Sequence, residues 1–507
     1  MIMLSAILLI SAYAFLFSLP DAVGVQSHAL PSKAKVEVVV DTSAAAAKTA
    51  TAKEEKRRSD DEESGSDEER RTTLDQNNKG TAGEPKLDAK TLTERLAEMK
   101  KNRPPRTVNH NKPKRKPRQY KPPTPAPPKW NVGYAISLTG CPKGTDDPLV
   151  DGAAVLKHSI HLNSHANPDS GSRYGYKMYA IVHPDAIDCA GPLFDIGYDL
   201  LIRDVPVPVD EIQGDFLRTK VVDNGCCGEK EYIKLHAYTI LKHPVVVHLD
   251  LDTIVMKPMD DLFDVILSDL NEEPNAPKEI EKRLPIMFDK PLPPKVDAFF
   301  TRDYNMVKAG KKHVGVQGGF LVIRTGMEPF HEYEKIIREG NFVEGKGWGG
   351  LGFGPFYGSL TFQGIVPYFY DALHPNTAVE LNRCYYNTMA DNPRDQKTVN
   401  DKVSGNCRDG RDDCEDCREI DVEEIYTAHF TLCQKPWSCL PHSQDMLQHR
   451  LCRKLHHEWF RVRAEVEGRK GEGKFDPDQF YGFCNHSGGR GYIPIDASRI
   501  IKKDEEE

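Results

Sequence analysis

Two aspartates separated by one residue follow a hydrophobic strand. Residues 245–249 read Val-Val-Val-His-Leu, and Asp250 and Asp252 come directly after them. In an extended chain alternate side chains point to the same face, so we expect the two carboxylates to converge. Two such carboxylates repel each other unless a cation lies between them, and Mg²⁺ or Mn²⁺ typically bridges carboxylates to a diphosphate. The alternative is that these aspartates only cap the next turn.

Strands and helices alternate around this segment. The hydrophobic pattern predicts strands over 132–140, 176–183, 198–207 and 244–255, and helices over 152–164 and 231–243. Such alternation indicates a mainly parallel sheet wrapped by helices. Ligands of these sheets bind beyond the carboxyl ends of the strands, so the chemical groups should follow each strand directly.

The run HLDLDTIVMKPMDDLFD over 248–264 resembles the DxD segment of glycosyltransferase family 8, the group that contains glycogenin and galactinol synthase. The similarity continues in family order over 130–437. The resemblance implies a GT-A type, Rossmann-like α/β domain. It also implies a retaining transfer of a hexosyl group from a UDP-sugar to a hydroxyl of a glycan, protein or lipid-linked acceptor.

The run HFTLCQKPW over 429–437 resembles the family's closing motif. The resemblance implies that His429 is the third protein ligand of the ion beside Asp250 and Asp252, and that Lys435 holds the diphosphate. An imidazole beside two carboxylates suits Mn²⁺ better than Mg²⁺. Cys433 stands close to the place where the family has a glycine.

Further donor-site residues are implied by the same resemblance. Leu138 and Thr139 would approach the uridine, and Lys234 would lie near the donor sugar. Gln317 stands where the family usually has Asn, and Asn387 ends another family segment.

Gln363 matches the Gln of the family's DQG segment, but Phe362 replaces the usual Asp, which leaves the donor sugar open. The resemblance implies that the catalytic candidates are Gln363, beside the reacting carbon, and Lys234, near the transferred sugar. The alternative from another class is a non-catalytic lumenal protein of the same fold that binds a nucleotide sugar or a glycan.

The first 25 residues predict a signal peptide or a signal anchor, because no charge occurs before Asp21. Residues 26–129 predict a disordered low-complexity stem, 130–465 the catalytic domain, and 466–507 a charged extension. This order is typical of a type II membrane enzyme of the Golgi lumen; cleavage would instead give a secreted protein. The basic stretch Lys101–Lys129 could also bind polyanions.

All 12 cysteines follow Pro128, which favours disulfides in an oxidising lumen. Cys414 and Cys417 could alternatively form half of a zinc site. Asn485 begins a glycosylation sequon, or an unmodified loop. The net charge of −8 argues against a nucleic-acid partner.

Overall fold

The computed structural model describes residues 127–141, 148–270, 276–288, 290–397, 403–439, 447–468 and 492–495. All of them belong to one compact unit, Pro117–Glu507. The predictions for the leader, for nearly all of the stem and for Asn485 lie outside the described residues. Within the described ranges, no helix is long and apolar enough to cross a membrane.

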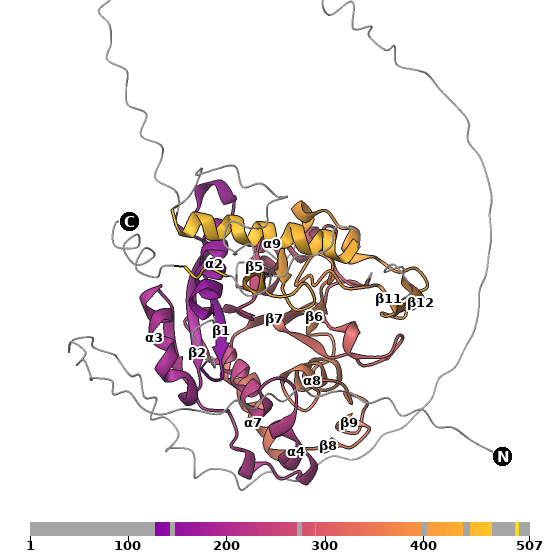
Figure 1. The fold of residues 1–507 in the computed structure, drawn as a ribbon. Coiled ribbons are helices and arrows are strands. Elements are labelled where there is room, and N and C mark those ends of the chain that lie inside the picture. Colours follow the sequence, from indigo (N-terminus) through magenta and orange to yellow (C-terminus); the bar gives the residue numbers. More distant parts are fainter. Residues whose placement is uncertain are drawn as a thin grey trace, which may run out of the picture. The chain divides into compact units, whose positions relative to one another are not determined.

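A seven-stranded sheet forms the centre of this unit (Figure 1). Its strands are β1 (Asn131–Leu138), β2 (Gly175–Val182), β3 (Asp199–Ile202), β4 (Val245–Leu249), β6 (Ala298–Arg302), β7 (Val316–Arg324) and β10 (Ala378–Glu380). They lie in the order β10-β6-β7-β4-β1-β2-β3. Neighbouring strands are parallel except that β7 runs antiparallel to both β4 and β6. The predicted mainly parallel sheet flanked by helices is confirmed.

Helices cover both faces of this sheet. They are α2 (Leu149–Leu162), α3 (Ile187–Asp195), α4 (Asp215–Lys220), α5 (Asp260–Ile266), α6 (Ala276–Glu281), α7 (Met327–Glu339), α8 (Phe362–Tyr368), α9 (Leu447–Val466) and the 3₁₀ helix η6 (Gly228–Thr239). Val245 and Val247 pack in the core that contains α2, α5 and α9, whereas Val246 packs with η6, α7 and α8. Burial on both faces explains why these strands are continuous apolar runs.

One predicted strand is two strands in the structure. The run 244–255 divides into β4 and β5 (Thr253–Val255), with residues 250–252 between them. β5 leaves the large sheet and pairs antiparallel with β13 (Thr427–His429). Two further small antiparallel pairs are β8 (Phe342–Val343) with β9 (Gly347–Trp348), and β11 (Arg394–Lys397) with β12 (Val403–Cys407).

Disulfides connect the segments that follow the sheet. The described bonds are Cys141–Cys189, Cys384–Cys417, Cys407–Cys414 and Cys433–Cys452, and Cys439 is also disulfide-bonded. The predicted disulfides are confirmed, and Cys414 and Cys417 belong to two different bonds rather than to a zinc site.

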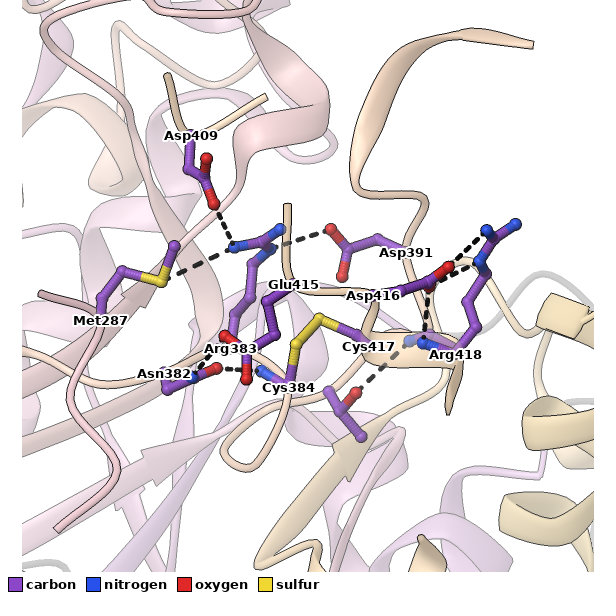
Figure 2. Close-up of a disulfide and its surroundings, with 12 residues drawn as sticks. Met287, Asn382, Arg383, Cys384, Asp391, Asp409, Glu415, Asp416, Cys417 and Arg418 are labelled. Carbon is purple, nitrogen blue, oxygen red and sulfur yellow. Dashed lines mark hydrogen bonds and ion pairs between the residues drawn. A yellow bond between two sulfur atoms is a disulfide. The ribbon is translucent and has the colours of Figure 1, made fainter. Parts of the chain in front are cut away.

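A buried arginine supports the segment that leads to β13. Figure 2 shows Arg383 beside the Cys384–Cys417 bond. Its Nε donates to Asp391 Oδ2 at 3.0 Å, and its Nη1 lies 3.5 Å from Asp409 Oδ2. The disulfide and these ion pairs hold residues 383–391 against residues 407–418, so this region is cross-linked where it has little regular structure.

Four residues near the end of the chain also belong to this fold. The hydroxyl of Tyr492 donates to Asp151 Oδ1 at 2.5 Å, and the backbone nitrogen of Ile495 donates to the same oxygen at 2.9 Å. Asp151 is buried on α2, and Ile495 is buried as well. Part of the stretch expected to be a charged extension therefore packs against α2.

Candidate metal and nucleotide site

Asp250 and Asp252 lie at the carboxyl end of β4. The backbone nitrogen of Asp250 still donates to Gly319 O of β7 at 3.1 Å, which fixes the point where the sheet ends. Asp252 follows in the turn before β5, and its side chain is buried. The expected extended backbone is wrong at this point, because the carboxylates are brought together by a turn between two strands.

His429 reaches these aspartates through strand pairing. It is the last residue of β13 and lies opposite Thr253 of β5. The next backbone nitrogen, that of Phe430, donates to Asp252 O at 2.9 Å. A residue far along the chain is therefore held one register position from Asp252.

The three side chains converge on one point. His429 Nε2 lies 3.2 Å from Asp252 Oδ1 and 3.9 Å from Asp250 Oδ2. One ligand atom from each of the three residues lies within 4.8 Å of the other two. Neighbouring ligands of an octahedral ion are about 3 Å apart when each is about 2.1 Å from the metal, so this donor set fits a divalent cation.

The remaining carboxylate oxygens face two lysines. Lys234 Nζ lies 3.0 Å from Asp250 Oδ1, and Lys435 Nζ donates to Asp252 Oδ2. Each aspartate thus directs one oxygen to an ammonium group and the other to the imidazole. The arrangement combines a cation-binding face with two positive charges, which suits a polyphosphate ligand.

Asp250 and His429 have the protonation states that a metal ligand needs. Burial raises the pKa of Asp250, but the adjacent Lys234 ammonium outweighs it, so the pKa lies below its usual value. Burial lowers the pKa of His429, which keeps the imidazole neutral and able to act as a ligand. Burial also lowers the pKa of Lys435.

Glu231 completes the environment of Lys234. Its Oε2 lies 3.0 Å from Lys234 Nζ, and Gly318 O accepts from the same ammonium at 3.2 Å. Burial lowers the pKa of Lys234, but Asp250 and Glu231 raise it more, so the net shift is upward. Sequence reasoning missed Glu231, although its position three residues before Lys234 on a helix was a usable signal.

A second layer supports the imidazole from behind. Gln317 Oε1 accepts from Gly319 N at 2.6 Å and from Asn387 Nδ2 at 3.3 Å. A methyl group at Gly319 would lie 2.4 Å from His429 Cε1, so the imidazole packs directly on the backbone of β7. Gln317 is buried, and its oxygen is occupied by these two donors. Sequence reasoning also missed Thr431, whose hydroxyl lies 2.9 Å from His429 Nε2, the nitrogen that faces the two aspartates.

The other predicted site residues lie around this centre. Gln363 is the second residue of α8, and a methyl group at Gly318 would touch both Lys234 Nζ, at 3.4 Å, and Gln363 Cγ, at 3.5 Å. Leu138 ends β1 and is buried. Thr139 follows it, and its side chain hydrogen-bonds to Cys227. The predicted residues therefore gather at one edge of the sheet, with Leu138 and Thr139 at the end of the neighbouring strand.

No protein-family model and no curated protein matches the chain. Among solved structures, mouse xyloside xylosyltransferase 1 is similar, with 13% sequence identity and a TM-score of 0.31 over 51% of this chain and 87% of that protein. The galactosyltransferase LgtC, solved with donor and acceptor sugar analogues, has 12% identity and a TM-score of 0.32 over 65% of this chain and 95% of its own.

Proposed function

We propose that this protein is a metal-dependent glycosyltransferase that resembles glycosyltransferase family 8. It transfers a hexosyl group from a UDP-sugar to a hydroxyl acceptor, with retention at the anomeric carbon. The observation that carries the proposal is the convergence of Asp250, Asp252 and His429 at the carboxyl edge of the sheet. In an α/β sheet this edge is the ligand-binding edge.

Different residues would bind the ion, the diphosphate and the sugar. Asp250, Asp252 and His429 would hold Mn²⁺, which supplies charge neutralisation for a departing diphosphate. Lys435 lies at the outer oxygen of Asp252 and is partly exposed, so it can also reach a phosphate oxygen. This arrangement supports catalysis mainly through electrostatic stabilisation of the leaving group.

Lys234 and Gln363 lie on the sugar side of the proposed site. Their closeness across Gly318 gives the site an ammonium and an amide next to each other. The ammonium orients Asp250, and the amide can contact sugar hydroxyls or the face of the reacting carbon. Leu138 and Thr139 would contact the uridine. Glucose, galactose and glucuronic acid are the candidate donor sugars.

The cellular location is proposed from the sequence, with one supporting feature. The described disulfides are typical of a protein that folds in an oxidising compartment. We propose the Golgi lumen, with the N-terminal segment as a membrane anchor unless it is cleaved, and an acceptor that is a glycan, protein or lipid-linked hydroxyl.

The test is UDP release by the full-length chain with each of the three UDP-sugars, in Mn²⁺ and after removal of metal with EDTA. We expect release with one donor, loss of release in EDTA, and a fall of at least about 10²-fold in Asp252→Asn. Asp261→Asn is the matched control, because Asp261, which lies on α5, accepts a hydrogen bond from Arg283 and lies outside the cluster.

Two results would contradict the enzyme proposal. If Asp252→Asn released UDP at the wild-type rate, and its circular dichroism spectrum showed that it was folded, Asp250, Asp252 and His429 would not hold a catalytic metal ion. If the protein bound UDP and Mn²⁺ but released no UDP from any UDP-sugar with any acceptor, it would instead be a non-catalytic nucleotide-sugar-binding protein of the same fold.

A further inference from the structure

Cys226 and Cys227 differ from the other cysteines of the described residues, because neither belongs to a disulfide. They are adjacent in sequence and lie immediately before η6. Their Sγ atoms are 2.8 Å apart. Cys226 is exposed and Cys227 is partly exposed, so reagents in solution can reach the pair.

The two thiols lie at the edge of the proposed donor site. Cys226 Sγ is 2.8 Å from Glu231 Oε1, and the other oxygen of Glu231 holds Lys234, which contacts Asp250. Cys227 hydrogen-bonds to the side chain of Thr139 beyond β1. The pair is therefore linked by direct contacts to both sides of the site.

We propose that Cys226 and Cys227 form a reversible disulfide with each other, so that this pair is a covalent modification site at the edge of the proposed donor site. The sulfur atoms need to approach by only about 0.8 Å to reach a bond of about 2.0 Å. The surrounding domain forms its other disulfides in the same conditions, so an accessible thiol pair at this separation is chemically poised to oxidise.

Adjacency of the cysteines makes such a bond reversible. Neighbouring Cα atoms are about 3.8 Å apart across a trans peptide, which is shorter than the roughly 4.4–6.8 Å that disulfides prefer. The resulting ring is strained, and strained disulfides are readily reduced. Gly225 and Gly228 flank the pair with φ of 70° and 60°, so the local turn depends on conformations that favour glycine on both sides.

The oxidant is a low-molecular-weight disulfide such as oxidised glutathione. The thiolate of one cysteine attacks a sulfur of the oxidant, forming a mixed disulfide and releasing one glutathione thiol. The second cysteine then attacks the protein sulfur of that mixed disulfide, forming the Cys226–Cys227 bond and releasing the second glutathione thiol. The two thiol protons go to the released glutathione thiolates, and the protein loses two hydrogens while the oxidant gains them.

Hydrogen bonding favours Cys227 as the first nucleophile. Its contacts with Cys226 and with Thr139 hold the pKa of Cys227 below the usual value of a thiol. The thiolate is the reactive form in thiol–disulfide exchange.

Peptide mapping tests this without any enzymatic assay. The full-length protein is treated with oxidised glutathione or with a mild reductant, denatured, labelled with N-ethylmaleimide and digested with trypsin. Cleavage after Lys220 and Lys230 releases a peptide, 221–230, that contains Cys226 and Cys227 but no other cysteine. The Cys433–Cys452 bond, followed in the same map, must survive the reductant.

After reduction we expect this peptide to carry two N-ethylmaleimide labels. After oxidation we expect it to carry no label and to have a mass two hydrogens below that of the unlabelled, reduced peptide. Cys226→Ser is the matched variant, and we expect it to carry one glutathione on Cys227 instead. Two labels after oxidation, glutathione on both cysteines of the wild type, or a bond to another peptide would overturn the proposal. So would thiols that resist labelling until one equivalent of zinc is removed by a chelator.

Discussion

At the residue scale, the Lys234 ammonium holds two carboxylates close together. Its side chain is 8% exposed, and that of Glu231 is 9% exposed, while Asp250 is the more open partner at 31%. A buried pair that loses one member leaves an uncompensated charge. The Lys234 ammonium therefore stabilises the folded site by neutralising Glu231 and Asp250.

We expect Lys234→Met to lower the free energy of unfolding by about 3–5 kcal/mol, because Glu231 and Asp250 would then repel each other without a counter-charge. Adding Glu231→Gln should recover at least about 1 kcal/mol of this loss, since one buried charge is removed. Urea unfolding at neutral pH measures both values.

The control for this prediction is Lys282→Met, which removes an exposed ion pair with Glu279. An exposed pair contributes about 0–1 kcal/mol, so the change should be small. Equal losses from Lys234→Met and Lys282→Met would mean that burial of the Lys234 network has no energetic consequence.

Individual site residues could be predicted where short spacing carried the signal. The Asp250 and Asp252 pair, and the His429 to Lys435 spacing, were visible in the sequence. Thr431 and the Cys226–Glu231 contact were not, because their importance depends on which side chains lie nearby in the folded chain. Spacing reports the periodicity of one element and cannot report contacts between elements.

At the element scale, the pairing of β5 with β13 places His429, and β7 supports it from the other side. Gly319 leaves no room for a side chain there, since a methyl group would lie 2.7 Å from His429 Nδ1 and 3.0 Å from Gln317 Oε1. The position of the imidazole is therefore set by three strands together.

We predict that Gly319→Ala raises the Mn²⁺ concentration for half-maximal UDP release by about tenfold or more, because the new methyl group displaces the imidazole. Overpacking of this kind should also cost about 1–3 kcal/mol of stability. Metal titration of UDP release and urea unfolding measure the two effects.

Gly191→Ala is the matched substitution, because nothing lies within 4 Å of a methyl group at that position. It should leave the metal requirement unchanged. A normal metal requirement in Gly319→Ala would show that the imidazole is not held by β7 in the way described.

A buried histidine on η6 makes stability depend on pH. Burial lowers the pKa of His236 from 6.5 to about 4, and its Nε2 lies 2.8 Å from Asp204 O. Because the folded-state pKa lies below the unfolded value, protons bind more readily to the unfolded chain. The contribution of neutral His236 is therefore present above pH 6.5 and is lost as the pH falls towards 4.

We expect the wild type to lose about 2 kcal/mol more stability than His236→Gln between pH 7.5 and roughly 4.5, since glutamine does not titrate. Urea unfolding of both proteins at several pH values gives the two slopes. Parallel slopes would mean that His236 has an ordinary pKa in the folded protein.

The elements themselves were largely predictable, and the exceptions have physical causes. The predicted strand 244–255 hides the turn after Leu249, because the strands on both sides of the turn are fully buried. Hydrophobic periodicity cannot mark a turn between two buried strands. The predicted helix over 231–243 is instead the 3₁₀ helix η6, which begins at Gly228 and ends at Thr239.

At the scale of the whole molecule, disulfides hold the closing segment in place. Cys433 lies four residues after His429 and is bonded to Cys452 of α9. α9 in turn lies beside α2 against the sheet (Figure 1). The bond therefore connects the strand that carries the imidazole to one of the helical layers.

We predict that Cys433→Ala with Cys452→Ala lowers the free energy of unfolding by about 3 kcal/mol, the loss expected for a loop of this length. The sequence separation is 19 residues, against 7 for Cys407–Cys414. Removing the shorter bridge in the same way should therefore cost about 1 kcal/mol less. Urea unfolding compares the two variants, and the reverse order of stability would contradict the loop argument.

The fold class and the disulfide-bonded state followed from the sequence, but the connectivity of the cysteines did not. Cys384, Cys407, Cys414 and Cys417 are close in sequence and allow several pairings. Only the fold places Cys384 against Cys417, through the ion pairs of Arg383 (Figure 2). Three-dimensional proximity, which spacing does not encode, decides the connectivity.

The contact of Tyr492 and Ile495 with Asp151 limits how the gene can be shortened. A recombinant protein that stopped after α9 would keep every residue of the proposed metal and donor site. It would nevertheless leave the Asp151 carboxylate inside α2 without the two donors that now satisfy it, beside the buried Arg463. Expression work should therefore trim from the amino terminus and retain the final residues, even though they lie far along the chain from the chemistry.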